Sequence, residues 1–171
     1  VGSEMCIRDS RKNDSSSLGD WVVDKNKLPN GIEGLLSDAK KHGVKFGIWI
    51  EPEMANTTSE LYEKHPDWVL KASERDVVLG RGGTQVVLDL ANPAVQDFVF
   101  GVVDNLMTSY PEIDYIKWDA NMSVQNHGSQ YLTKDNQSHM YIEFHRGFEK
   151  ICQRIRAKYP DLTIQACASG G

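Results

Sequence analysis

The strongest candidate for chemistry is a lysine and an aspartate that lie two residues apart in an apolar run, Lys117 and Asp119. If 113–119 is a strand, Lys117 and Asp119 point to one face and Trp118 points to the other. An ammonium beside a carboxylate keeps that carboxylate charged at neutral pH. A charged carboxylate suits a nucleophile that attacks an anomeric carbon, and Asn121 just beyond could hydrogen-bond a sugar hydroxyl. A structural ion pair that closes a strand explains the same residues equally well, so this run alone leaves both readings open.

Four apolar extended runs are available to position these residues, at 44–50, 85–90, 113–119 and 162–167. Stretches with helical periodicity lie between them, at 32–39, 95–106 and 141–159. Asn92 and Pro93 provide a cap and a first-turn proline for the second helix, and Gly43 is placed to end the first. Strands and helices in regular succession predict a parallel α/β sheet. The sheet could be open and doubly wound, or it could be half of a (β/α)8 barrel.

Polar residues at the ends of the runs favour the barrel. These residues are Glu51 and Glu53, Asp89, Asp119, and Cys167 with Ser169. Barrel enzymes draw their catalytic groups from the carboxyl ends of several strands. No glycine-rich loop follows an early strand, so the fingerprint of a dinucleotide site is missing. We therefore predict an α/β fold that forms part of a (β/α)8 TIM barrel.

The composition excludes several classes of protein. The 171 residues carry a net charge of −5, which gives no broad basic surface for nucleic acid. No apolar run reaches the roughly 20 residues that span a bilayer, so we predict no membrane segment. The three cysteines, Cys6, Cys152 and Cys167, show neither a CxxC pair nor the spacing of a zinc site. We predict no metal, and a reducing, cytoplasmic setting.

The run Lys117-Trp118-Asp119-Ala120-Asn121 resembles the Lys-Trp-Asp-x-Asn nucleophile motif of glycoside hydrolase family 36, whose members are mostly α-galactosidases. Other segments resemble that family in the same order along the chain. They are 17–21, 46–54, 65–68, Gly80-Arg81 with 85–90, and 167–171. Two positions depart from the family pattern, Ala120 and Met122, and they concern fine substrate contacts. The resemblance covers about residues 11–171.

The resemblance implies a retaining α-galactosidase that acts on α-galactoside oligosaccharides without a cofactor. Asp119 would be the catalytic nucleophile, and Lys117 and Asn121 would bind galactose hydroxyls. The other implied substrate contacts are an aromatic wall from Trp49, a cation from Arg81, and a pocket lined by Cys167, Ser169 and Gly170. The resemblance gives Glu51 and Glu53 no lead role, and we expect them to pair with or support other groups. Turn and cap contacts, not a calcium site, are expected for Asp14, Asp20 and Asp24.

Alternatives remain within and beyond this family. Galactosyl transfer of the raffinose-synthase type and α-N-acetylgalactosaminidase action use the same scaffold. A non-catalytic α-glycan-binding relative is a second class, although it would not need a charged nucleophile. A third class is a metal-dependent barrel enzyme whose ligands would be Glu51, Glu53, Asp89 and Asp119. Assembly of the full-length parent as a homo-oligomer is left open.

Two parts of the chain differ in their resemblance to the family. Residues 1–10 do not resemble it, and we expect a non-native or artefactual segment there. Residues 11–171 are expected to form an incomplete catalytic barrel domain with about strands two to five of eight. The family's acid/base aspartate is expected beyond Gly171, and two open sheet edges predict marginal folding.

The isolated 171-residue chain should therefore not hydrolyse an aryl α-galactoside. A retaining glycosidase needs two carboxyl groups about 5 Å apart, and the resemblance supplies only Asp119 within these residues. Release of p-nitrophenol by the purified chain is the measurement. Hydrolysis above the buffer blank, with retention of configuration, would contradict the expectation.

Overall fold

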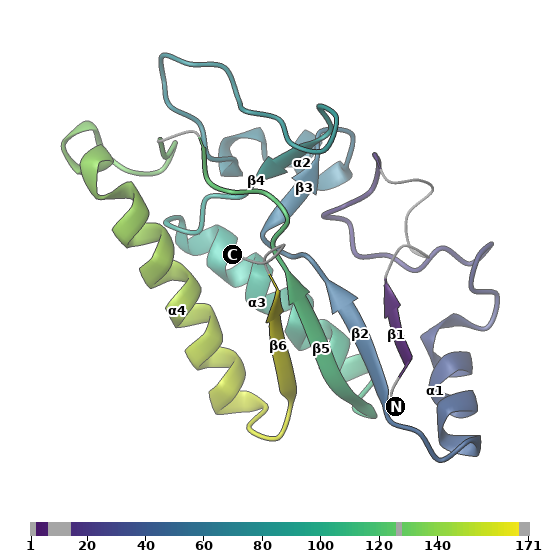
Figure 1. The fold of residues 1–171 in the computed structure, drawn as a ribbon. Helices are drawn as coiled ribbons and strands as arrows, with labels where there is room; N and C mark the ends of the chain where they lie inside the picture. Colours follow the sequence, from purple (N-terminus) through teal and green to yellow (C-terminus); the bar gives the residue numbers. More distant parts are fainter. Residues whose placement is uncertain (1–2, 7–14, 126–127, 168–171) are drawn as a thin grey trace.

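Four parallel strands form the main sheet of the computed structural model, which describes residues 3–6, 15–125 and 128–167 (Figure 1). In order across the sheet they are β1 (Ser3–Cys6), β2 (Phe46–Ile50), β5 (Ile113–Asp119) and β6 (Thr163–Cys167). The crossovers contain α1 (Gly31–Lys41), α3 (Pro93–Ser109) and α4 (Met140–Lys158). The predicted parallel α/β sheet is confirmed.

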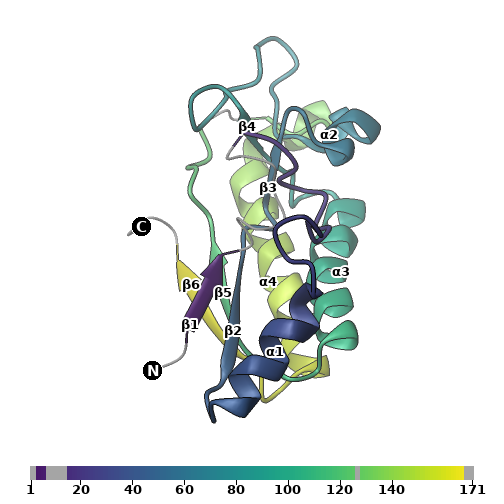
Figure 2. The ribbon, with the colours of Figure 1, turned by 90° about the vertical axis from the view of Figure 1, so that its right-hand side faces the viewer.

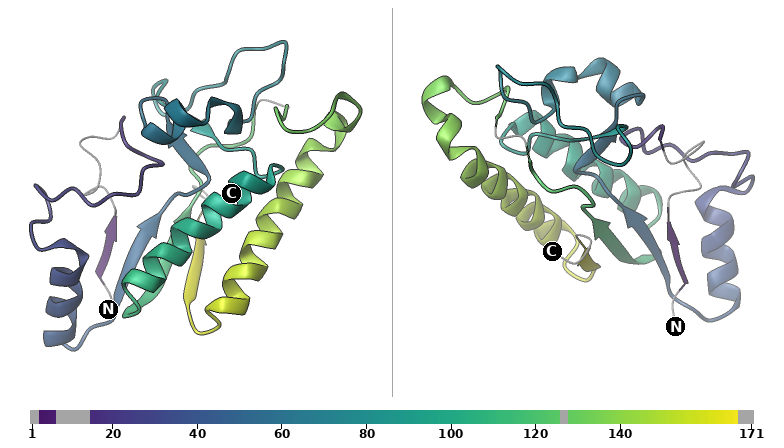
Figure 3. Two further views of the ribbon diagram at one scale, coloured as in Figure 1. Left: turned by 180° about the vertical axis from the view of Figure 1, so that it is seen from behind. Right: turned by 45° about the horizontal axis from the view of Figure 1, so that its top comes forward.

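All three long helices cover the same face of the sheet (Figure 2). Seen from behind, α3 and α4 lie side by side across the sheet, and α1 stands apart near the β1 edge (Figure 3). An open doubly wound sheet carries helices on both faces, so this arrangement speaks against that alternative. Among the described residues, no helix combines the length and the apolar character that crossing a bilayer requires.

The three long helices end or begin where the local sequence signals predict. Gly43 follows α1 with a φ of +66°, a backbone conformation that glycine adopts without a steric penalty. Asn92 caps α3, because its side chain accepts a hydrogen bond of 2.9 Å from the amide of Ala94. Helix α4 ends at Lys158, two residues before Pro160. These boundaries confirm the predicted helices.

The run 85–90 does not form a strand of the main sheet, and that prediction is wrong. Only β4 (Gln85–Val87) is extended, and it pairs antiparallel with β3 (Met54–Asn56) in a separate two-stranded sheet. The amide of Leu88 donates to the carbonyl of Glu53 and the amide of Asp89 to that of Trp68. The run is buried on both sides, so its pattern did not reveal its partner.

Strand β1 lies in the segment that we expect to be non-native. It pairs parallel with β2, from Ser3 opposite Phe46 to Cys6 opposite Trp49. The segment therefore completes one edge of the sheet through its backbone. The pairing does not test the origin of the segment, which stays a prediction.

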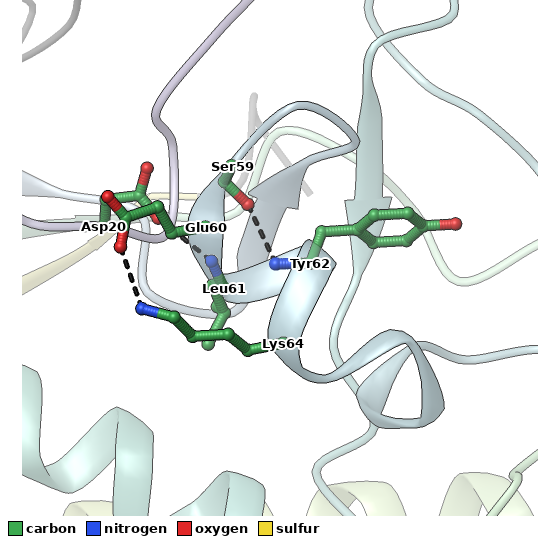
Figure 4. Close-up of polar contacts among 6 residues, drawn as sticks. All are labelled: Asp20, Ser59, Glu60, Leu61, Tyr62 and Lys64. Atoms are coloured by element: carbon green, nitrogen blue, oxygen red, sulfur yellow. Dashed lines mark hydrogen bonds and ion pairs between the residues drawn. The ribbon is translucent and has the colours of Figure 1, made fainter.

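Short elements connect β2 to α3 and β5 to α4. They are α2 (Glu60–Lys64), the 3₁₀ turn Pro66–Trp68 and the 3₁₀ segment Lys134–His139. Asp20 lies in the loop before α1 and connects that loop to α2, because its Oδ1 accepts a 3.1 Å hydrogen bond from the amide of Leu61 (Figure 4). Ser59 caps α2 by accepting from Tyr62. The predicted cap role of Asp20 is confirmed.

The hydrophobic core lies between the sheet and the helices. The strand residues that point into it are fully or almost fully buried: Ile48, Ile50, Ile113, Ile116 and Trp118. The opposite face bears Trp49, Tyr115 and Lys117, which are half-buried, and the exposed Gln165. No helix of the described residues covers this second face. The sheet therefore separates an apolar side from a polar side.

Helix α4 approaches the loop after β4 through a glycine. A Cβ atom at Gly147 would lie 1.9 Å from the carbonyl oxygen of Leu90. Gly101 in α3 offers a contrast, because a Cβ atom there would have no neighbour within 4 Å. The close approach of α4 thus depends on the absence of a side chain at Gly147.

Gly147→Ala should destabilise the fold by about 1–3 kcal/mol, because the added methyl group overpacks a rigid backbone contact. Gly101→Ala is the matched control, and it should be neutral or stabilise α3 by up to about 1 kcal/mol. The measurement is denaturant unfolding of both variants of the whole protein that contains this chain. Equal free energies of unfolding for the two variants would contradict the prediction, because they would show that the contact between Gly147 and Leu90 tolerates a methyl group.

Candidate active site

The carboxyl ends of β2, β5 and β6 bring together residues that are far apart in the sequence. Lys117 lies opposite Trp49 of β2, and Asp119 lies opposite Cys167 of β6. The amide of Ala120 donates to the carbonyl of Cys167 at 2.9 Å, which extends the pairing past the end of β5. Paired residues of parallel strands share a face, so these side chains meet at one edge of the polar face.

The carboxylate of Asp119 is the centre of this cluster, and the residue is only 8% exposed. Its Oδ2 accepts hydrogen bonds from the indole Nε1 of Trp49 at 2.9 Å and from Nδ2 of Asn121 at 2.7 Å. Its Oδ1 accepts from the amide of Ala120 at 3.1 Å. The thiol of Cys167 also hydrogen-bonds the carboxylate. Four predicted site residues are therefore in direct contact: Asp119, Trp49, Asn121 and Cys167.

These donors keep Asp119 charged. Burial alone would raise the pKa of its carboxyl group, but hydrogen bonds from Trp49, Asn121, Cys167 and Ala120 together lower the pKa below the ordinary value. Our prediction attributed the charge to the ammonium of Lys117. In the structure, the groups that lower the pKa of Asp119 most are its hydrogen-bond donors. Lys117 pairs with Trp49 of the neighbouring strand and lies on the same face of the sheet.

Glu51 stands behind this cluster and supports Asn121. Its Oε1 accepts two hydrogen bonds of 2.9 Å, one from the amide of Asn121 and one from Nδ2 of the same residue. Glu51 is 1% exposed. A chain of contacts thus runs from Glu51 through Asn121 to Asp119, which the sequence analysis missed apart from a general expectation that Glu51 pairs with or supports another group.

Glu53 makes its contact on the opposite face of the sheet, which the helices cover. Its Oε1 accepts a 2.6 Å hydrogen bond from the indole Nε1 of Trp118, whose ring meets the ring of Phe148 edge-on at a centroid distance of 5.8 Å. Burial raises the pKa of Glu53 to about 7, the Trp118 hydrogen bond opposes this, and the nearby charge of Glu51 adds to it. The two glutamates after β2 therefore have different roles on different faces.

The structure does not bring Arg81 into the cluster. Arg81 is exposed, has a φ of +43°, and lies in a turn in which the Thr84 hydroxyl donates to its carbonyl at 3.0 Å. The turn nevertheless borders the chain after β5, because a Cβ atom at Gly80 would lie 2.6 Å from the sulfur of Met122. Ser169 and Gly170, predicted to line the pocket, lie outside the described residues.

The described residues offer no set of metal ligands. No group of three or more His, Cys, Asp or Glu side chains gathers among them as a cation site would require. Asp89, which the metal-dependent alternative needs, is fully buried and accepts hydrogen bonds from Ser129 and from the amide of Ala91. Asp24 makes a turn contact with the amide of Asn26, and Asp14 lies outside the described residues.

A mostly apolar cleft of about 610 Å³ lies between α1 and α3. Its walls include Ile32 and Leu35 of α1, Ile48 and Ile50 of β2, and Leu106 of α3. The Ile48 and Ile50 side chains point to the helix-bearing face, away from Trp49 and Asp119. The cleft is therefore separate from the polar cluster.

A scan of protein families matches residues 7–171 to the melibiase family. The chain belongs to the melibiase family. It is 38% identical to α-galactosidase 2 of Pediococcus pentosaceus and 36% identical to α-galactosidase AgaA of Geobacillus stearothermophilus, in each case over its whole length. The chain spans 24% of the length of each of these relatives. Its resemblance to glycoside hydrolase family 36 is thereby confirmed.

Solved structures agree with this membership of the melibiase family. The crystal structure of AgaA matches with a TM-score of 0.91 and 34% identity over 99% of this chain and 24% of that chain. The α-galactosidase of Lactobacillus brevis matches with a TM-score of 0.87 and 40% identity, over 94% of this chain and 21% of that one. Variants of AgaA have been crystallised in complex with raffinose and with stachyose.

The raised pKa of Glu53 predicts a pH-dependent stability. The folded pKa of about 7 exceeds the ordinary value of 4.5, so the native state binds more protons than the unfolded state between these values. Stability is therefore highest below the lower value and falls as the pH rises through about 7. Glu53→Gln keeps an acceptor for Trp118 and cannot become charged, so it should gain in stability over the parent across that window.

Denaturant unfolding of the whole protein at several pH values from 4.5 to 8 measures this difference. The advantage of Glu53→Gln should grow with pH to a few kcal/mol, in line with the linkage between pKa and stability. Glu63→Gln, at an exposed position of α2, is the matched control for the loss of a glutamate charge and should leave the stability of the parent nearly unchanged. A constant difference for Glu53→Gln would mean that Glu53 is charged in the native state without penalty.

Proposed function

We propose that the whole protein is a retaining α-galactosidase in which Asp119 is the nucleophile. The observation that carries the proposal is a carboxylate at a strand end whose pKa is lowered by donors from the two flanking strands and from the chain just after β5, in a chain of the melibiase family. A nucleophile toward an anomeric carbon has to be ionised, and it does not have to be basic. The hydrogen bonds on Asp119 meet that requirement at neutral pH.

The proposed substrates are oligosaccharides with a terminal α-linked galactose. The complexes of the relative AgaA with raffinose and stachyose support this class of substrate. Identity of 38% and 36% over the whole chain to α-galactosidases supports the same configuration of the sugar.

The main sheet fits a (β/α)8 barrel, of which β1, β2, β5 and β6 would be four consecutive strands. Strands that are neighbours in the sheet follow one another along the chain, and their helices all cover one face. In such a barrel the second face of the sheet becomes the interior, and the carboxyl ends carry the active site. The polar face with Trp49, Lys117 and Gln165 would then face the barrel axis. The position of the Asp119 cluster supports this reading.

The reaction would proceed by double displacement. A carboxylate oxygen of Asp119 attacks the anomeric carbon, the glycosidic bond breaks, and the leaving oxygen takes a proton from a second carboxyl group. Water then loses a proton to that group, attacks the anomeric carbon of the glycosyl ester and frees Asp119. Glu51 is poorly suited as the acid, because it is 1% exposed and its Oε1 is held by two N–H groups of Asn121. We therefore assign the acid/base to a carboxyl group outside this cluster.

The remaining residues would bind the sugar around Asp119. Trp49 holds Asp119 through its indole N–H and would place its ring against the apolar face of galactose. Lys117, opposite Trp49 on β5, and Asn121 would contact hydroxyl groups. The pocket wall would come from Cys167 together with Ser169 and Gly170, and Arg81 would approach from its turn beside Met122. These roles follow from the family resemblance and from the shared edge of the sheet.

Asp119→Ala should lower kcat of the whole protein by on the order of 10⁴-fold or more, as the loss of a covalent nucleophile does in other enzymes. Azide should restore turnover and give a β-galactosyl azide, because the small anion attacks from the side that the carboxylate vacates. Hydrolysis of an aryl α-galactoside, with the first sugar product followed by NMR, is the measurement.

Asp114→Ala is the matched control for that experiment. Asp114 lies on the same strand, is partly exposed, and pairs with Lys45 at 3.5 Å away from the cluster. This variant should keep the activity of the parent and release α-galactose first. Near-normal turnover of Asp119→Ala would refute the nucleophile, and β-galactose as the first product of the parent would refute retention. Transfer to a sugar acceptor in place of water would appear as a new oligosaccharide.

A further inference from the structure

We infer that Glu51 is a positioning residue that fixes the Asn121 amide and, through it, the Asp119 carboxylate. The inference rests on the proposed function of Asp119. It goes beyond that function because Glu51 lies behind the cluster and needs no contact with the sugar.

The first support is the geometry of the contacts. Oε1 of Glu51 accepts from the amide and from Nδ2 of Asn121, both at 2.9 Å. These two bonds fix both the backbone and the side chain of Asn121 relative to the end of β2. Nδ2 of Asn121 then donates to Oδ2 of Asp119 at 2.7 Å. A single amide nitrogen therefore bridges two carboxylates that lie 68 positions apart in the numbering of the chain.

The second support is the chemistry of the bridging amide. An asparagine side chain has an NH₂ group with two donors and a carbonyl oxygen that only accepts. Glu51 and Asp119 both present carboxylate oxygens to the NH₂ group, so a flipped Asn121 would place its carbonyl oxygen against two acceptors. Glu51 thus selects one orientation of the amide. That orientation is the one in which Asn121 donates to the proposed nucleophile.

The third support is burial. Glu51 is 1% exposed, and a buried carboxylate is costly unless donors compensate for the lost water. Donation from both nitrogens of Asn121 supplies part of that compensation. These bonds help to hold Asn121 in place, because breaking them would remove that part of the compensation for burying the carboxylate.

The arrangement of charged groups makes it possible to separate the effect of Glu51 on Asp119 from the effect of losing another buried carboxyl group. Among the described residues, the charged or titratable groups at the cluster are Glu51 after β2, Lys117 on β5 and Cys167 on β6. Glu53, two residues from Glu51, belongs to the opposite face and accepts from Trp118. The chain therefore contains a second buried glutamate just after the same strand whose hydrogen bond goes to Trp118 on the other face, and it provides a matched control.

The test compares Glu51→Ala, Glu51→Gln and Glu53→Gln in the whole protein, with an aryl α-galactoside as the probe. Glu51→Ala should lower kcat by about 10²-fold with little change in KM, the scale expected when a catalytic group is misplaced by about 1 Å. The acid limb of its kcat/KM profile should move to higher pH, because Asp119 loses an aligned donor. Glu51→Gln keeps a carbonyl acceptor for Asn121 and should recover part of both effects. Glu53→Gln should keep the kcat and the acid limb of the parent.

A second substrate separates positioning from proton donation. If Glu51 donated the proton, Glu51→Ala would lose much activity on an alkyl α-galactoside and little on an aryl galactoside with an activated leaving group. A positioning residue predicts similar losses on both substrates. Circular dichroism verifies folding, and Glu51→Gln carries the test if Glu51→Ala does not fold.

The outcomes distinguish the inference from the proposed function. An inactive parent on α-galactosides would overturn the proposed function. An active parent with an unchanged kcat and acid limb in the folded Glu51 variants would overturn the positioning role alone. A loss confined to the alkyl galactoside would also overturn it. Similar losses on both substrates, with a shifted acid limb and partial recovery in Glu51→Gln, would establish it.

Discussion

The constraint on which the site depends is that a carboxylate with 8% exposure must remain charged. Desolvation favours the neutral form of Asp119, and it is opposed by hydrogen bonds from Trp49, Asn121, Cys167 and Ala120. These donors come from two strands that flank β5, namely β2 and β6, and from the chain just after β5. No single element could supply them, so the parallel register of β2, β5 and β6 is itself part of the chemistry of the site.

Consecutive residues at the end of β5 connect that site to the core. Trp118 points to the helices, where it donates to Glu53 and meets Phe148 of α4, whereas Asp119 points to the polar face. A slip of one residue in the register would turn Asp119 toward the apolar core and expose Trp118. The packing of Trp118 therefore specifies the register that places the carboxylate among its donors. Because Trp118 and Asp119 are adjacent residues, the packing of Trp118 against the helices and the position of Asp119 on the polar face depend on each other.

Features with a local cause could be predicted from the sequence, and features that depend on distant partners could not. Asn92, Pro93 and Gly43 act on their own helices, and the alternation around Asp119 follows from the strand period. The run 85–90 was misplaced because an apolar run that is buried on both sides does not reveal its pairing partner. The support from Glu51 was missed for a similar reason, since it depends on a contact between residues that are 70 positions apart. The motif residues Trp49, Asn121 and Cys167 were found because the family resemblance carries such distant contacts implicitly.

The raised pKa of Glu53 follows in part from the crowding of carboxyl groups at this edge of the sheet. Glu51, Glu53 and Asp119 place three carboxyl groups around the ends of β2 and β5, and full ionisation of all three would accumulate like charge in a buried region. Glu53 has an apolar environment and one indole donor, so its pKa rises to about 7, and the charge of Glu51 contributes to that rise. Glu51 has two donors from Asn121, and Asp119 has several of its own. Below about pH 7 a proton on Glu53 therefore relieves like-charge repulsion in this region, while the lowered pKa of Asp119 keeps a negative charge on the face where the proposed reaction needs it.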